Sequence, residues 1–424
     1  MRITTEHNRV SVSSIDLFSP SFYALGDPHE AWRTLRAESP VHWQQVDGDR
    51  GFWALTRYAD VCDVLRRFRA FTSEHGNLLT TLGRGDAAGG KMLAVTDPPR
   101  HTQIKRQINS YFTHSAVAAL EPQVRTLARR ALAPGVHGEA FDLATAMAVY
   151  PIAFTALLLG INRADWARLR RFAYVAIADQ DPEFANDSGV GRDLEQAHAE
   201  IFAYFMGEIR EENIGRPDLT GAVARARLGN TPLSRAEQVY NLYSILLGAT
   251  VTTAHAACAG MLALIENPGQ FERWQRLGCT SSLVEEVLRW TSPANHFLRY
   301  ARHDLKIGGT QIRAGEAVTV WLGSADRDEA VFADPYHFEV DREPNPHIAF
   351  GVGAHRCIGA PIARLALRIL FDEVLRHVER FEAAGPVEHL ASNFIAGIKR
   401  FPVRIVLKAG HKADFASVEP LHAP

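Results

Sequence analysis

Apolar side chains recur every three or four positions along most of this chain, which is the spacing of helices with one buried face. The pattern predicts helices over Pro28–Glu38, with Asp27 as the N-cap, and over residues 58–68. It continues over residues 115–229, apart from a break at residues 179–191. The hydrophobic pattern therefore predicts a mainly helical protein.

The longest apolar stretch, residues 238–265, contains no charged residue and is long enough to cross a bilayer. Polar residues interrupt it, among them Asn241, Ser244 and His255, so a buried helix of a large globular protein fits better. Ser234 and Glu237 have the spacing of a capping box and predict where this helix begins.

Short β-rich runs between turn residues predict a minor β region. Residues 41–43 and 52–55 form a predicted hairpin around Asp47-Gly48-Asp49, and residues 305–307 and 317–321 are further short strands. The glycine-rich stretch 76–90 is predicted to be a mobile loop. After it, a helix is expected to start at residues 96–99, with Thr96 or Asp97 as its cap.

Composition narrows the class of protein. The chain has 424 residues, with 46 Lys and Arg against 48 Asp and Glu, and this even balance does not favour binding to nucleic acid. The four cysteines are too sparse for a disulfide scaffold, so we expect the reducing cytoplasm. No signal peptide or membrane anchor is recognisable. We expect one monomeric domain over residues 1–424, with flexible ends at 1–20 and 409–424.

The segment from Phe350 to Gly359 carries most of the chemical information. Cys357 lies where a loop meets a helical pattern, and helix amides stabilise a thiolate at such a position. The glycines let the backbone approach something flat and large, and the basic residues beside the cysteine can meet an anionic group. Alone, a cysteine is more often a buried structural residue. In this setting, a cysteinate that ligates haem iron fits all these features.

The pattern Phe-x-x-Gly-x-His-x-Cys-x-Gly resembles the haem-ligand signature of the cytochrome P450 family, and the resemblance extends over residues 28–404. It implies a mainly α fold with a minor β region, shaped as a triangular prism. Haem b would be buried between the long central helix and the cysteine loop. Around the haem, the resemblance assigns Cys357 as axial iron ligand, Phe350, Gly351 and Gly359 as loop residues, and His101, Lys105, Arg299 and His355 as propionate donors. Because Lys105 stands where the family usually has arginine, Arg106 could share its role.

Glu286 and Arg289 match the Glu-x-x-Arg motif of the family. The motif alone is weak, because oppositely charged residues three apart are common on helix surfaces. Its position ahead of Cys357 gives it weight. The resemblance implies a structural ion pair behind the haem, completed by Arg327 or Arg342.

The centre of the long helix resembles the oxygen-activating segment of the family. Gly248 and Ala249 would leave room for dioxygen, and Thr252 would support a water that delivers protons. Val251 is the departure, because the family usually has an acid there. Three explanations stay open. Substrate hydroxyls or ordered water carry the proton, or His255 helps, or the enzyme performs a variant reaction. For His255, a packed core histidine is the simpler interpretation.

The resemblance also implies a substrate pocket built from several distant segments. Its predicted lining residues are Leu78, Leu79, Leu82, Ile177, Ala178, Leu247, Val251, Ala294, Asn295, Phe297, Phe394 and Ile395. Asn295 is polar where an aliphatic residue is usual. This favours a substrate with a polar group, unless Asn295 is a solvent-facing turn residue after Pro293.

The implied activity is that of a haem-thiolate monooxygenase, which inserts one oxygen atom from O2 into a mid-sized, natural-product-like substrate by hydroxylation or epoxidation. A separate ferredoxin and ferredoxin reductase would supply electrons. They would meet a basic face formed by Arg100, Arg106, Arg356, Arg364 and Arg368. The alternative is that these arginines are simply solvated surface charges. A peroxide-driven or non-hydroxylating P450 variant, and a haem-binding protein without turnover, are the alternatives.

Overall fold

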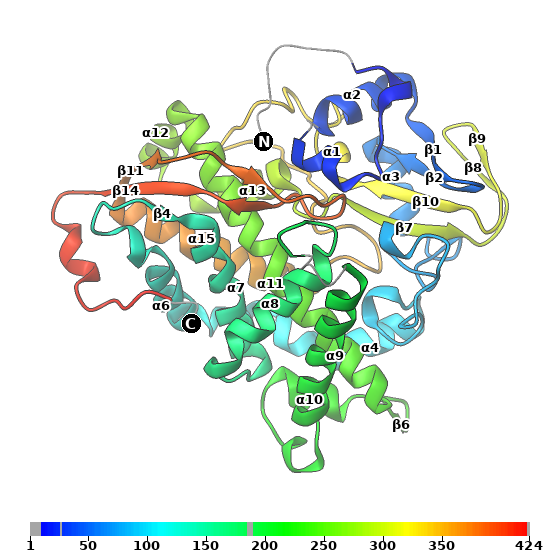
Figure 1. Ribbon diagram of the computed structural model, residues 1–424, viewed down its shortest axis with the longest axis horizontal. Coiled ribbons are helices and arrows are strands. Elements are labelled where there is room, and N and C mark those ends of the chain that lie inside the picture. The colour runs from blue at the N-terminus through cyan, green and yellow to red at the C-terminus, as the bar shows by residue number, and fades with distance from the viewer. Residues whose placement is uncertain (1–9, 26–27, 185–189, 422–424) are drawn as a thin grey trace.

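The computed structural model describes residues 10–25, 28–184 and 190–421. Figure 1 shows helices filling most of a roughly triangular molecule, with a small sheet at one edge. The α-helices are α1 (Pro20–Leu25), α2 (Pro28–Glu38), α3 (Tyr58–Arg66), α4 (Arg100–Ile108), α5 (His114–Ala118), α6 (Glu121–Leu132), α7 (Leu143–Leu159), α8 (Trp166–Ile177), α9 (Val190–Glu208), α10 (Leu219–Arg225), α11 (Arg235–Glu266), α12 (Pro268–Leu277), α13 (Thr280–Thr291), α14 (Leu322–Ala325) and α15 (Ala360–His377). The mainly helical fold predicted from the sequence is confirmed.

The minor β region consists of one five-stranded sheet and smaller pieces. The large sheet has the order β1 (Val41–Asp47), β2 (Arg50–Leu55), β10 (Ala317–Trp321), β7 (His296–Ala301), β3 (Phe71–Thr72). A three-stranded sheet joins β11 (Val378–Ala383), β14 (Pro402–Leu407) and β4 (Phe141–Asp142). The two-stranded pairs are β5 (Arg227–Leu228) with β6 (Thr231–Pro232), β8 (Leu305–Ile307) with β9 (Thr310–Ile312), and β12 (Glu388–His389) with β13 (Ile398–Arg400). The predicted hairpin of β1 and β2 is confirmed.

Helix α11 runs through the centre of the molecule and packs against α7, α8, α9 and α13 (Figure 1). The predicted capping box starts it: Glu237 N donates to Ser234 Oγ at 3.3 Å, and Ser234 N donates to Glu237 Oε2 at 2.8 Å. The helix is long and apolar enough to span a membrane, but 72% of its apolar window is buried inside the protein. It is thus the core helix that its polar interruptions predicted.

The start of α4 differs from the sequence-based expectation. Neither Thr96 nor Asp97 caps this helix, since Pro99 occupies the N-cap position without a side-chain bond. The Asp97 carboxylate instead accepts from Ser73 N at 3.0 Å and Ser73 Oγ at 2.9 Å, and it pairs with Arg302. Asp97 therefore ties the segment before α4 to β3 and β7 rather than capping a helix.

The two ends of the chain were expected to be flexible, but their described parts pack into the core. Ile15 and Leu17 are 5% and 0% exposed. At the other end, Phe415 and Leu421 are also buried, and Leu421 N donates to Arg130 O at 3.0 Å. Apolar residues in short irregular segments gave no periodic signal, which is why the pattern missed this packing. Residues 1–9 and 422–424, and the predicted cap Asp27, lie outside the described residues.

Candidate active site

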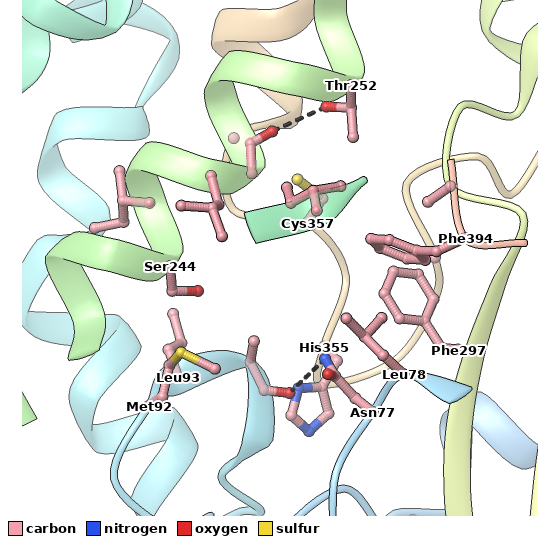
Figure 2. A pocket seen from close by; sticks show the side chains of 18 of the residues that line it. Asn77, Leu78, Met92, Leu93, Ser244, Thr252, Phe297, His355, Cys357 and Phe394 are labelled. Carbon is pink, nitrogen blue, oxygen red and sulfur yellow. Dashed lines mark hydrogen bonds between the residues drawn. The ribbon is translucent and has the colours of Figure 1, made fainter. Parts of the chain in front are cut away.

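One large cavity of about 890 Å³ lies between α11 and the loop that precedes α15. Figure 2 shows Thr252 and Ser244 from α11 facing the same space as Cys357, with Leu78, Phe297 and Phe394 on another side. The walls come from segments far apart in the sequence. The cavity therefore exists only in the folded chain.

The cysteine loop is shaped by its own hydrogen bonds and two left-handed glycines. Cys357 N donates to Phe350 O at 2.9 Å, and Gly351 and Gly353 have φ of +67° and +76°. At Gly353 a Cβ would lie 2.6 Å from Leu65 O, so only glycine lets α3 pack this closely. Gly359 ends the loop, and a Cβ there would lie 3.7 Å from Cys357 Sγ. The sequence thus folds into a tight loop that presents one thiol to the cavity.

The Cys357 thiol is exposed to the cavity but enclosed by the protein around it. This burial raises the pKa of the Cys357 thiol, while the amides of Gly359 and Ala360 and the charge of Lys105 act in the opposite direction. The amides belong to the N-terminus of α15, where helix dipoles favour negative charge. Such a setting suits a thiolate whose charge is neutralised by a metal ion.

Three groups predicted to bind propionates meet at the cavity with unmet hydrogen-bonding capacity. Arg299 is 6% exposed, and among the described residues its guanidinium donates only to the backbone oxygen of Leu298. The His101 Nδ1 atom is buried without a partner, and the His101 and His355 rings lie 4.4 Å apart. Burial lowers the pKa of Arg299 to about 10, that of His101 to about 4 and that of His355 to about 2. Carboxylates would satisfy these buried donors.

Lys105 lines the cavity but is placed differently from the propionate role predicted for it. Its Nζ donates to Ala354 O at 3.1 Å and to Arg356 O at 2.9 Å. The ammonium group thereby fastens the cysteine loop to α4. Arg106, the suggested substitute, is exposed and is not among the residues that line the cavity.

The predicted ion pair of Glu286 and Arg289 is present behind the cysteine loop. Both residues are fully buried, and two bonds of 2.7 and 2.8 Å join the guanidinium to the carboxylate. Arg342 contributes a further bond of 3.2 Å to the same carboxylate. Of the two suggested third members, Arg342 is therefore the one in contact. The Arg327 guanidinium instead lies 4.6 Å from the centre of the Trp290 ring.

On α11, the predicted oxygen-binding residues Gly248, Ala249 and Thr252 all line the cavity. Thr252 Oγ1 donates to Gly248 O at 2.9 Å, a bond drawn in Figure 2. This leaves the lone pairs of the hydroxyl free to accept a hydrogen bond. Ser244, which was not predicted, lies four residues before Gly248 and lines the same cavity. The four-residue spacing of Ser244, Gly248 and Thr252 on one helix face could have revealed it.

Val251 and His255 do not line the cavity. Val251 is fully buried in an apolar cluster with Tyr174, Leu390 and Ile395. His255 Nδ1 accepts a hydrogen bond from Ile398 N at 3.2 Å, and burial lowers the pKa of His255 to about 4. The expectation that Val251 faces the substrate is therefore wrong. His255 is a packed, neutral core histidine.

Eight of the twelve predicted pocket residues line the cavity, and Leu82, Asn295 and Ile395 join Val251 as the four that do not. Those that do are Leu78, Leu79, Ile177, Ala178, Leu247, Ala294, Phe297 and Phe394. Leu82 instead packs in a core cluster with Trp32 and Trp321, and Ile395 packs beside Val251. Asn295 is 3% exposed, and its amide donates to Asn393 O at 3.2 Å. It neither lines this cavity nor faces solvent, so it says nothing about the substrate.

Polar residues of the cavity wall that sequence reasoning missed come from several segments. Among them are His198 of α9, Tyr240, Asn241, Tyr243 and Ser244 of α11, and Asp86, Asp179 and Gln180 from loops. The His198 and Tyr243 rings meet edge to face at 5.5 Å. Nothing in the sequence relates α9 to α11, so only the folded structure brings them together.

The five arginines of the predicted basic face have unequal surroundings. Arg364 forms two bonds with Glu285, of 2.7 and 2.8 Å, Arg368 pairs with Glu121 and Asp372, and Arg100 pairs with Glu237. Arg106 and Arg356 are exposed, and neither forms an ion pair among the described residues. The free positive charge is therefore smaller than the sequence suggested.

A cysteine thiol in a deep cavity, ringed by buried cationic and imidazole donors, defines a haem-thiolate protein. Comparisons agree. A family model described as Cytochrome P450 matches residues 187–388. Cytochrome P450 NovI of Streptomyces niveus is 36% identical over 406 residues, covering 93% of this chain and 97% of the relative. Linalool 8-monooxygenase of Pseudomonas putida is 31% identical over 410 residues, covering 93% and 99%.

Solved structures give the same result. P450 OxyD, involved in the biosynthesis of vancomycin-type antibiotics, superposes with a TM-score of 0.83 at 29% identity, covering 93% of this chain and 100% of that one. Mycobacterium marinum cytochrome P450 CYP268A2, in complex with pseudoionone, has a TM-score of 0.84 at 28% identity, covering 95% and 100%. The chain belongs to the cytochrome P450 family. It is a P450 monooxygenase with haem b as its cofactor.

The residues of the cavity fit this cofactor. Cys357 would ligate the iron, and Arg299, His101 and His355 would hold the propionates, since all line the cavity and Arg299 and His101 keep buried nitrogen atoms without a sufficient partner. When bound, haem supplies electron transfer and oxygen activation, which a thiolate ligand promotes. The remaining wall of the cavity is left to bind and orient a substrate.

Proposed function

We propose that this P450 inserts one oxygen atom from O2 into a mid-sized, natural-product-like substrate by hydroxylation or epoxidation. The observation that carries the proposal is that the Thr252 hydroxyl and the Cys357 thiol line one enclosed cavity of about 890 Å³. Linalool 8-monooxygenase, which is 31% identical, supports the reaction by its name, and OxyD, involved in the biosynthesis of vancomycin-type antibiotics, supports the class of substrate.

The substrate should combine an apolar body with at least one polar group. Leu78, Phe297 and Phe394 offer an apolar surface, and the Phe297 and Phe394 rings meet at 5.9 Å. Ser244, His198 and Tyr240 offer hydroxyl and imidazole groups on the same cavity wall.

Protons should reach Thr252 through water or a substrate hydroxyl. Val251 cannot transfer a proton, and His255 is a core residue whose Nδ1 already accepts a backbone amide. Thr252 donates its own hydrogen to Gly248 O and can accept one from a water or a substrate hydroxyl. Of the three explanations for Val251, this is the one that uses only groups at the cavity.

A ferredoxin and its reductase should deliver the electrons. Arg106 and Arg356 are exposed, and Lys105, next to Arg106, binds the backbone of the cysteine loop. A partner that meets these arginines would therefore lie close to Cys357. An acidic patch on a small ferredoxin is complementary to them. We place this enzyme in the cytoplasm as a monomer, with residues 1–424 forming one catalytic domain.

A peroxide-driven or non-hydroxylating reaction is the second candidate. The observation in its favour is the buried, apolar Val251, because a reaction that starts from hydrogen peroxide needs fewer delivered protons. The two candidates differ in the source of the inserted oxygen atom.

The experiment begins with a spectral binding screen of terpenoids, steroids and fatty acids against the haem-loaded protein. The best ligand is then incubated with ¹⁸O₂, a surrogate ferredoxin, its reductase and NADPH, and in parallel with hydrogen peroxide alone. Product that carries one ¹⁸O atom, formed only in the first mixture, is expected. Oxidised product formed only with peroxide would establish the second candidate instead.

A further inference from the structure

Three metal-ligating side chains meet at the end of α15 that is far from the haem site. His377 is the last residue of α15, and His411 and Asp414 belong to the short 3₁₀ helix His411–Phe415. The His377 and His411 Nδ1 atoms are 3.2 Å apart. The Asp414 Oδ2 atom lies 2.9 Å from His411 Nδ1 and 3.4 Å from His377 Nδ1. The three ligand atoms thus form a nearly equilateral triangle.

The size of this triangle matches one face of a tetrahedral zinc site. With Zn–N and Zn–O bonds of about 2.0–2.1 Å, neighbouring ligand atoms in a tetrahedron are about 3.3 Å apart. All three observed separations lie within a few tenths of an ångström of this value. The cluster therefore needs little rearrangement to accept an ion, with a water as the fourth ligand.

A carboxylate behind His377 holds its ring in the orientation that a ligand needs. His377 Nε2 lies 3.2 Å from Glu373 Oε2, and Glu373 is fully buried between Arg125 at 2.7 Å and Arg129 at 2.6 Å. Because both arginines favour the ionised form of Glu373, its carboxylate can accept a hydrogen bond from His377 Nε2, and the tautomer that donates it has its Nδ1 lone pair toward the cluster. A carboxylate bound to the remote nitrogen of a histidine is the usual support of a metal ligand.

The access to the cluster differs from one ligand to the next. His377 is 1% exposed and contacts the Phe415 ring, whereas His411 and Asp414 are 35% and 49% exposed at their side chains. An ion can enter from the solvent side without opening the core. The segment that carries His411 and Asp414 is held at both ends: Lys408 N donates to His377 O at 2.9 Å, and Leu421 N donates to Arg130 O.

We propose that His377, His411 and Asp414 bind one divalent transition-metal ion, Zn²⁺ by ligand type, and that the ion fastens residues 408–421 to α15. Two imidazoles and one carboxylate are ligands that zinc accepts. This site is separate from the haem site, since α15 has 18 residues and is about 27 Å long, and Cys357 precedes its other end.

The test measures zinc bound to EDTA-treated, haem-loaded, full-length protein by equilibrium dialysis with metal analysis. Wild type should bind one Zn²⁺ per chain, and His411→Ala and Asp414→Asn should bind it at least tenfold more weakly. His137→Ala, which removes an exposed histidine elsewhere, serves as the matched control and should bind like wild type. The reduced carbon monoxide spectrum checks that each variant retains its fold around the haem.

Thermal unfolding provides the second readout. Zinc should raise the melting temperature of wild type and His137→Ala, because an ion that binds only the folded chain stabilises it. The rise should be absent in His411→Ala and Asp414→Asn. Wild type that binds no zinc, or equal zinc affinity in wild type, His411→Ala and Asp414→Asn, would overturn the proposal.

Discussion

The cysteine side and the substrate side of the cavity are built in different ways. On the cysteine side, defined by the loop 350–359 and the pair Glu286–Arg289 with Arg342, a buried ion-pair network supports the loop. On the substrate side, defined by Leu78, Thr252, Phe297 and Phe394, the wall is apolar with scattered hydroxyls. The first side holds one chemical group in one position, whereas the second leaves room for a ligand.

On the substrate side, a buried neutral histidine, rather than an ion pair, joins two of the segments that form the wall. His296 Nε2 accepts from Leu79 N at 3.2 Å, and its Nδ1 lies 3.1 Å from Asn393 O. It therefore joins the loop of Leu78 to that of Phe394. The position of the cysteine loop therefore depends on buried ion pairs. The shape of the substrate pocket depends in part on neutral histidines, which acid can protonate.

The largest effect is expected from breaking the buried ion pair. Glu286→Ala leaves the buried Arg289 and Arg342 guanidinium groups without their shared carboxylate, which costs about 3–5 kcal/mol of unfolding free energy. Most of the protein should then fail to retain haem, as measured by haem content and urea unfolding. Arg273→Ala removes an exposed pair with Asp341 and should cost less than about 1 kcal/mol. An equal loss of unfolding free energy in the buried-pair variant and in Arg273→Ala would show that the buried ion pair is no more important than an exposed one.

Acid should destabilise the substrate side through its histidines. Burial lowers the pKa of His255 and of His296 to about 4, so the unfolded chain binds more protons between about pH 6.5 and pH 4. Stability is therefore full above about pH 6.5 and falls by about 1.4 kcal/mol per pH unit for each histidine as the pH is lowered.

Thermal unfolding between pH 7.5 and 5 measures this dependence. His255→Asn keeps an acceptor for Ile398 N but does not titrate, so its melting temperature should fall less steeply with acid than that of wild type. His303→Asn, which changes an exposed histidine, should follow wild type. An unchanged slope in His255→Asn would show that these histidines do not set the acid limit.

Thr252→Ala should separate electron use from product formation. Without the hydroxyl that accepts a proton-delivering water, product per NADPH should fall about tenfold or more, with hydrogen peroxide released instead. Thr250→Ala removes a buried hydroxyl that has no partner and does not line the cavity, so its coupling should match wild type. Thr252→Ala with wild-type coupling would leave Thr252 without a role in proton delivery.

The smallest effect is expected at Leu78, for which Leu82 of the same loop is the comparison. Leu78→Ala enlarges the cavity and should change ligand affinity several-fold, while unfolding free energy changes by less than about 1 kcal/mol. Leu82→Ala removes a core side chain that is 2% exposed and should lower stability by about 2–5 kcal/mol with little change in affinity. Spectral titration and urea unfolding would show whether the two properties separate.

The cysteine side could be predicted from the sequence because its features are local. The spacing around Cys357, and the three-residue separation of Glu286 and Arg289, place the groups within one loop or one helix turn. The capping box of α11 is equally local. Only the third member of the ion pair stayed open, since Arg327 and Arg342 both lie in an irregular segment.

The substrate side could be predicted only in part because it is assembled from distant segments. Asn295 and Phe297 are two residues apart, yet only Phe297 reaches the cavity, since Asn295 bonds to Asn393 from a separate loop. His198 approaches α11 through helix packing that no local spacing records. The pairing of His377 with His411 and Asp414 likewise depends on how the C-terminal segment returns to α15.

The reduced carbon monoxide spectrum of the purified protein tests the central claim, that the Cys357 thiolate ligates haem iron. Wild type and Cys279→Ser, which alters another exposed cysteine, should show the strongly red-shifted Soret band of a thiolate-ligated haem, and Cys357→Ser should lose it. A wild-type spectrum without the red-shifted band, or a Cys357→Ser variant that keeps it, would contradict the account.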